Sequence, residues 1–98
     1  MSTIAITETK KGARIWIQAL ESKGITGSHV LVSIAPDQAA IVLTFATYTD
    51  KPKGWRKVTQ SKGGVVDLES KKVVQWAQGA TQATMEVIGQ KIIIRRAI

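Results

Sequence analysis

The sequence predicts a mainly β fold assembled from two related halves of one chain. Apolar and polar residues alternate over several short segments, and this period of two is typical of strands that are buried on one face. The same order of elements, from strand and glycine turn through short helix to hairpin, occurs twice at an interval of about 52 residues. The chain has 98 residues, which is enough for one domain and too few for two of ordinary size.

We expect a single domain over 1–98, with a half-repeat at 4–46, a linker at 47–55 and a half-repeat at 56–96. Each half is of the ββαββ type and has one short helix. Because a few short strands are marginal in water on their own, the two halves are expected to interleave around one core. Closing the strands into a barrel would also protect their edges.

The first half is expected to contain two strands, one short helix and a β-hairpin. Ile15 and Ile17 are two positions apart, so they share one face of a strand. Lys10-Lys11-Gly12 is typical of a turn, and Gly24 is placed to end the helix. In chain order the expected elements are strands at 4–8 and 14–17, a helix at 19–23, and hairpin strands at 30–34 and 41–45.

The second half follows the same order after a linker that contains Pro52 and Gly54. Ser61-Lys62-Gly63-Gly64 is typical of a turn, and Ser70 is a suitable residue to cap the start of a helix. In chain order the expected elements are a strand opened by Val58, a strand at 65–68, a helix at 70–76, and hairpin strands at 83–87 and 91–96.

The residues that share a face of these elements predict the core. Trp16 and Trp76 lie within element patterns and are expected at the core or its edge. For Trp55, packing under the linker is favoured over stacking on a base. The other expected core residues are Ile15, Ile17, Val32, Ile34, Leu43, Leu68, Val73, Met85, Val87 and Ile94.

The charge of the chain favours a polyanionic partner. The net charge is +7, from 14 basic and 7 acidic residues. The excess is uneven, because residues 1–46 carry a net charge of +1 and residues 56–98 carry +5. We therefore expect the second half to dominate the attraction to a polyanion. The alternative is a surface that is basic only for solubility.

Several classes of function lack their characteristic residues. The chain has no cysteine, which excludes disulfides, thiolate metal sites and a cysteine nucleophile. His29 is the only histidine, and it has neither a clustered ligand set nor a recognisable triad partner. We therefore expect a protein that is not an enzyme and that uses no metal, cofactor or small-molecule substrate.

The sequence also predicts a soluble cytoplasmic protein. Residues 1–12 lack the basic start and apolar run of a signal peptide. No apolar run approaches the roughly 20 residues that a membrane-spanning helix needs. A membrane partner is therefore not expected.

Short motifs in both halves match a known pattern. In the second half these are Arg56-Lys57-Val58, the segment 63–70, the pair Lys71-Lys72 and the closing strand 92–96. They resemble the AbrB-like (SpoVT/AbrB) swapped-hairpin DNA-binding family, and residues 12–27 are similar to its SymE-like branch. The resemblance implies a swapped-hairpin barrel, formed either within one chain as a monomeric pseudo-dimer or by a homodimer.

The resemblance also implies a nucleic-acid-binding face. In the family, basic residues of the first strand, the turn and the helix line one face of the barrel, where they would neutralise phosphates. The expected contact residues are Arg56, Lys57, Lys62, Lys71 and Lys72 in the second half, Lys10, Lys11 and Arg14 in the first half, and Lys53 in the linker. The expected function is that of a small transcriptional regulator that binds double-stranded DNA.

Two other functions remain open on the sequence. One is a protein-interaction module, such as an antitoxin-like protein or a phage- or plasmid-encoded inhibitor, that binds an acidic surface of another protein. The other is a SymE-like toxin that binds RNA or DNA. A steep dependence of duplex binding on salt would favour the regulator over the protein-interaction module.

Overall fold

The computed structural model describes residues 2–97, so Met1 and Ile98 of the expected domain lie outside the described residues. Within this range the chain is mainly β, as the sequence predicts. It contains one α-helix and two single turns of 3-10 helix, labelled η. In chain order the elements are β1 Ser2–Ala5, β2 Thr7–Thr9, β3 Gly12–Ile17, η1 Glu21–Lys23, β4 His29–Ser33, β5 Ala40–Ala46, β6 Trp55–Lys57, η2 Ser61–Gly63, β7 Val66–Ser70, α1 Lys71–Ala77, β8 Gln82–Ile88 and β9 Lys91–Arg96.

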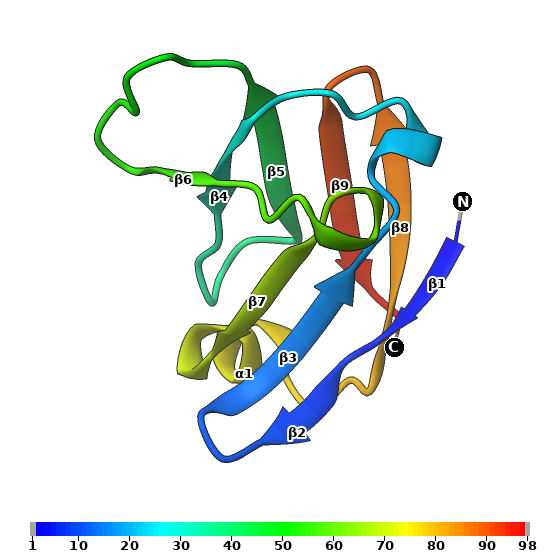
Figure 1. Ribbon diagram of the computed structural model, residues 1–98. Coiled ribbons are helices and arrows are strands. Elements are labelled where there is room, and N and C mark those ends of the chain that lie inside the picture. The colour runs from blue at the N-terminus through cyan, green and yellow to red at the C-terminus, as the bar shows by residue number, and fades with distance from the viewer. Residues whose placement is uncertain (1, 98) are drawn as a thin grey trace.

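The strands form two antiparallel sheets. The larger sheet has the order β1-β8-β9-β5-β4-β6, and the smaller has the order β2-β3-β7. In Figure 1 the smaller sheet crosses in front of the larger one, and α1 lies at their lower end. Each sheet ends in edge strands, so the expected closure into one ring of strands is not present among the described residues.

Strands from the two predicted halves pair at the centre of both sheets. In the smaller sheet β3 pairs with β7, and Ile15 lies opposite Leu68. In the larger sheet β5 pairs with β9, and Val42 lies opposite Ile93. The two parts of the chain are therefore interleaved, as the weakness of isolated hairpins led us to expect.

The core lies between the two sheets and α1. Alternation holds along the central strands, where Ile15 and Ile17 of β3 and Leu43 of β5 are buried. Trp76 is also fully buried, as expected. Seven of the ten other expected core residues are buried, and the three that are only partly buried and pack against the core are Val32, Ile34 and Val87.

The prediction for Trp16 is wrong. Its side chain is 37% exposed on the outer face of the smaller sheet. The reason is the period of two along β3, because Ile15 and Ile17 point inward and Trp16, between them, must point outward.

The two helical segments differ in length. Helix α1 buries Val73, Trp76 and Ala77, which stand at helical spacing along one face. The expected helix of the first half is reduced to the single turn η1, which buries none of its residues. Without an apolar stripe to pack against the sheets, a longer helix has nothing to stabilise it here.

Two boundaries differ from the expected ones. The first strand is divided at Ile6, whose burial turns the chain from the larger sheet into the smaller one. Strand β6 begins at Trp55, inside the expected linker, because residues 55–57 pair with β4; Val58 follows that strand and does not open it. No helix within residues 2–97 is long and apolar enough to span a bilayer.

Candidate nucleic-acid interface

The turn between β2 and β3 lies directly beside the start of α1. Gly12 makes this approach possible, since a Cβ at this position would lie 2.5 Å from the backbone oxygen of Ser70. Its φ of +132° is also a conformation that other residues rarely adopt. The exposed pair Lys10 and Lys11 is thereby brought next to Lys71, the first residue of α1.

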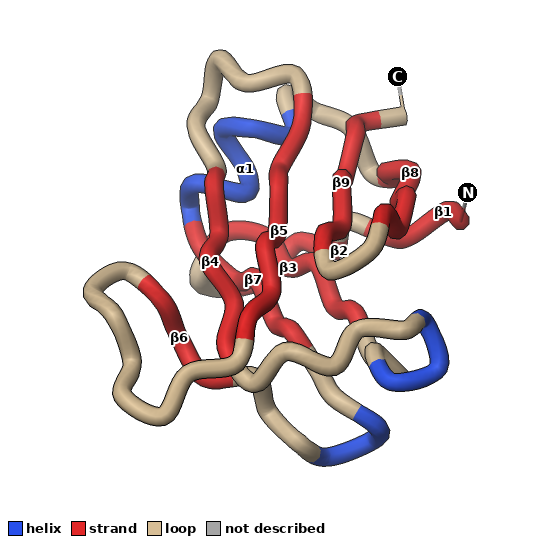
Figure 2. The backbone as a smooth tube through the Cα atoms, turned by 90° about the horizontal axis from the view of Figure 1, so that it is seen from above, coloured by secondary structure: helices blue, strands red, loops and turns tan. Residues whose placement is uncertain are grey.

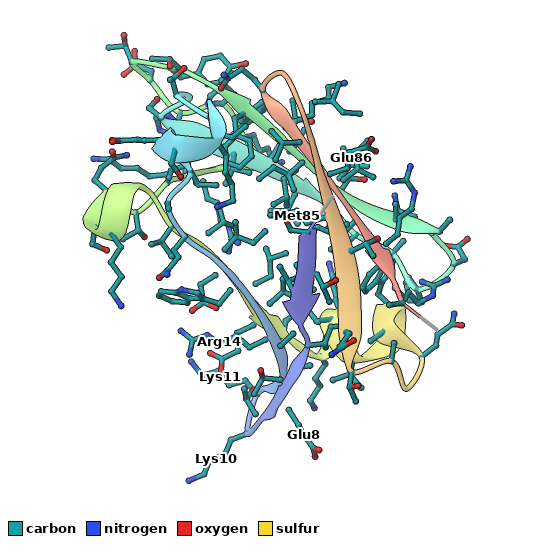
Figure 3. The ribbon with its side chains drawn as sticks, turned by 90° about the vertical axis from the view of Figure 1, so that its right-hand side faces the viewer. Glu8, Lys10, Lys11, Arg14, Met85 and Glu86 are labelled. Carbon is teal, nitrogen blue, oxygen red and sulfur yellow. The ribbon has the colours of Figure 1, made fainter. Side chains whose placement is uncertain are left out.

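A groove separates these two elements. Its volume is about 430 Å³, and both Lys10 and Lys71 line it, together with Glu8. Figure 3 shows Lys10 at the tip of the β2–β3 hairpin, with Lys11 and Glu8 on either side of it. Lysines that are far apart in the sequence therefore border one depression of the surface.

The outer face of the smaller sheet carries an arginine that is already paired. Arg14 donates from Nε and Nη2 to the two carboxylate oxygens of Asp67, each at 2.9 Å. This hydrogen bonding raises the pKa of Arg14 above its ordinary value, and the negative charges of Asp67 and Glu69 act in the same direction. Arg14 therefore stays charged, but Asp67 neutralises part of its attraction for a phosphate.

Trp16 lies on the same face, between two cations. The guanidinium carbon of Arg14 is 4.6 Å from the centre of the Trp16 ring, and Nζ of Lys62 is 5.5 Å from it. The indole Nε1 donates to Oε1 of Gln18 at 3.2 Å. The ring is thus held in place while more than a third of the side chain remains exposed.

Strand β6 adds further basic residues next to β7. Arg56 donates from Nη2 to the backbone oxygen of Asp67 at 3.1 Å. Arg56 and Lys57 are both exposed, and both line a small depression that Asp67 also lines. Arg14 and Arg56 therefore meet at the same aspartate from opposite parts of the chain.

Most of the expected contact residues are brought together around the smaller sheet. The segments 7–17 and 56–72 contain eight of the nine expected residues and three carboxylates, which gives a net charge of +5 out of the total of +7. The ninth residue, Lys53, lies apart in the loop 47–54, which Figure 2 shows projecting from the body of the molecule beside β6. We call the surface formed by segments 7–17 and 56–72 the basic surface.

Trp16 is the member of this surface that residue-by-residue reasoning assigned to the core. The signal that places it outside was present in the alternation Arg14-Ile15-Trp16-Ile17, where two buried isoleucines leave the other two residues on the opposite face. Its size and apolar character favoured the core interpretation instead. The pairing of Arg14 with Asp67 had no comparable local signal, because it depends on the register of β3 against β7.

His29 does not contribute to the basic surface. It is buried, its Nδ1 lies 2.7 Å from Oγ of Ser28, and its ring contacts Tyr48 edge-on. Within residues 2–97 no group of three or more His, Asp or Glu side chains is placed to hold a metal ion.

Comparisons with known proteins add no relative from which a role could be transferred to this surface. What it binds must therefore be inferred from its own geometry and charge. No family model, no curated protein and no solved structure matches the chain.

Proposed function

We propose that this chain is a small DNA-binding protein that holds duplex DNA against the basic surface, in the manner of an AbrB-like transcriptional regulator. The observation that carries the proposal is the concentration of charge. A net charge of +5 lies in two segments that are distant in sequence and adjacent in space. The rest of the chain carries only +2.

The exposure of these residues suits contact with phosphates. Seven of the eight basic side chains of the surface are exposed, and Arg14 is partly buried. Lysine and arginine that neutralise phosphates release the counterions of DNA, so they contribute affinity without reading sequence. The base contacts or DNA shape that would give a sequence preference are a separate matter.

We infer further that the two halves form an internal pseudo-dimer of the swapped-hairpin type. In the β4–β5 hairpin Ser33 pairs with Val42, and in the β8–β9 hairpin Met85 pairs with Ile94, so both members are displaced by 52 residues. The order of the larger sheet supports the same view, since exchanging β1 with β6, β8 with β4 and β9 with β5 reverses it. The mass of the protein in solution tests this inference, because a folded monomer is expected and an obligate dimer would contradict it.

The proposed function is tested by measuring duplex binding over a range of salt concentrations. The logarithm of the affinity should fall linearly with the logarithm of the salt concentration, with a slope of about −0.9 for each phosphate that is neutralised. The combined variant Arg56→Glu, Lys71→Glu and Lys72→Glu should weaken binding strongly and flatten the slope.

Lys91→Glu is the matched control for a single charge reversal. Lys91 is exposed at the start of β9, outside the basic surface. It should reduce affinity much less than Lys71→Glu does. Equal losses would mean that charge acts diffusely and that the basic surface is not a site, and no duplex binding at low salt would contradict the proposed function altogether.

A protein partner is the second candidate function, and one observation favours it. Val74 is 46% exposed, and it lines the groove that Lys10 and Lys71 border, together with the buried Ile6. An apolar floor with basic edges suits an acidic segment of another protein. This function becomes the better one if the protein fails to bind duplex DNA at low salt.

A further inference from the structure

We propose that Trp16 is a platform on which an unpaired nucleobase stacks, so that the basic surface prefers a nucleic acid with at least one exposed base. The proposal rests on the proposed function, because the cations around Trp16 must first hold the phosphates. It goes beyond that function by naming the structural state of the strand that is recognised.

The three tryptophans of the chain have different surroundings. Trp76 is fully buried in the core. Trp55 is partly buried and packs edge-on against Tyr48, with ring centres 5.1 Å apart. Trp16 is 37% exposed, and among the described residues no other aromatic ring packs against it. An uncovered indole on a sheet face is therefore a property of one position only.

Trp16 is fixed in place by its neighbours. Arg14 lies over the ring at 4.6 Å and is itself held by two hydrogen bonds to Asp67. Gln18 accepts a hydrogen bond from the indole nitrogen at 3.2 Å. A side chain that is already ordered loses little conformational entropy when a ligand binds, which increases the affinity it can contribute.

The chemistry around Trp16 matches a nucleotide. An aromatic ring stacks on the face of any base, and cations beside it meet the phosphates of the same strand. Arg14 and Lys62 supply those cations within 5.5 Å of the ring centre. Arg14 adds a planar guanidinium on which a base can also stack.

The state of the strand follows from geometry. In an intact duplex both faces of every base are covered by its neighbours, so a tryptophan on a sheet cannot reach them. A base in a single strand, a loop or a bulge has a free face. Single-stranded DNA and RNA share this chemistry, and the experiment below distinguishes them.

The test compares binding of three probes: oligothymidylate, oligouridylate and a duplex of random sequence. Trp16→Ala should weaken binding of the two single strands by roughly 5- to 150-fold, the range expected for one stacked base. Its effect on the duplex and on the salt slope should be small. Trp16→Phe keeps an aromatic ring and should retain most of the affinity for the single strands. A larger loss for oligouridylate than for oligothymidylate would identify RNA as the preferred strand.

Tyr48→Ala is the matched control, since Tyr48 is also 37% exposed but lies in the loop after β5, away from the basic surface. It should leave binding of all three probes unchanged. Fluorescence gives a second readout in a Trp55→Phe background, where Trp16 is the exposed indole and Trp76 is buried. Stacking of a base should quench that emission, and Trp16→Phe in the same background should abolish the quenching.

The failures of the two proposals can be told apart. If the protein binds the duplex but Trp16→Ala leaves single-strand binding unchanged, the stacking platform is wrong and the proposed function stands. If Trp16→Ala weakens duplex and single strand equally, Trp16 acts by positioning Arg14, and the platform is again wrong. If neither kind of probe binds the protein at low salt, the proposed function fails and the platform fails with it.

Discussion

The two halves of the chain follow the same order of elements, but they differ in what comes after the central strand of the smaller sheet. After β3 the chain makes only the single turn η1, with no buried residue. After β7 it makes α1, which buries three side chains, the largest of them Trp76. One half therefore supplies a helical anchor for the core, and the other supplies a short connection.

The charges differ in the same direction. Helix α1 begins with Lys71 and Lys72, both exposed, whereas the lysine of η1, Lys23, donates to the backbone oxygen of Gln18 at 2.9 Å. Both halves contribute strands to each sheet, but the helical anchor and most of the free charge belong to the second half. A pseudo-symmetric scaffold can thus carry an asymmetric surface, because the surface residues are not constrained by the pairing of the strands.

The comparison breaks most severely if the anchor is removed. Trp76→Ala should lower the free energy of unfolding by about 3–5 kcal/mol, because it leaves a large cavity at a fully buried position. Urea denaturation followed by fluorescence or circular dichroism measures this loss. Glu21→Ala, an exposed change in η1, should stay within about 0.5 kcal/mol of the unchanged protein. Losses of similar size would show that α1 is no more of an anchor than η1.

The next largest effect is expected where the hairpin of the first half meets the helix of the second. Gly12→Ala should destabilise by about 1–3 kcal/mol from its positive φ alone, and the contact with the backbone of Ser70 should add to this loss. Gly79→Ala is the control, since Gly79 also has a positive φ, +86°, but a Cβ there would enter open space. Urea denaturation of both variants separates the two causes, and equal losses would mean that the approach to Ser70 tolerates a methyl group.

Asp67→Asn tests how far the second half restrains the charge of the first. The change releases Arg14 from its carboxylate partner, so duplex binding should tighten and the salt slope should steepen by up to about 0.9. Glu86→Gln is the matched control, because Glu86 pairs with Arg95 at 3.4 Å and has a similar side-chain exposure, 42% against 36%. Glu86 lies on the side of the molecule opposite Arg14, as Figure 3 shows, so its loss should change binding less. Equal tightening would contradict a localised site.

The smallest effect concerns the start of α1. Ser70 stands where a capping residue is expected, but its side chain makes no capping hydrogen bond. Ser70→Ala should therefore change the free energy of unfolding by less than about 0.5 kcal/mol, where a functioning cap is worth about 1 kcal/mol. A loss of a full cap in urea denaturation would show that the serine does cap the helix in solution.

Local patterns were sufficient for the strands and much of the core. The hairpins β4–β5 and β8–β9 occur where alternation predicts them, and seven expected core residues are buried. The short length of η1 could not be predicted from helix-forming residues alone, because a helix is stabilised here by its packing and not by its propensity. The division of the first strand at Ile6 between two sheets likewise depends on tertiary packing.

The candidate site was predictable in its charges and not in its geometry. Eight of the nine expected basic residues lie around one sheet, and their types and positions could be read directly from the sequence. Their arrangement depends on contacts across the chain, such as the pair of Arg14 with Asp67 and the approach of Gly12 to Ser70. The exposure of Trp16 is an intermediate case, since strict alternation along β3 predicts it and residue type argues against it.

The interleaving of the strands also affects how the chain must fold. Strand β5 finds its partner β9 only at the end of the chain, with Ala40 opposite Arg95, and β1 pairs with β8 in the same way. Contacts between such distant residues require large loops to close before they contribute any stability. We expect this protein to fold slowly for its size, on a scale of about milliseconds to seconds. During synthesis, β5 must wait with one edge unpaired until the last strand leaves the ribosome.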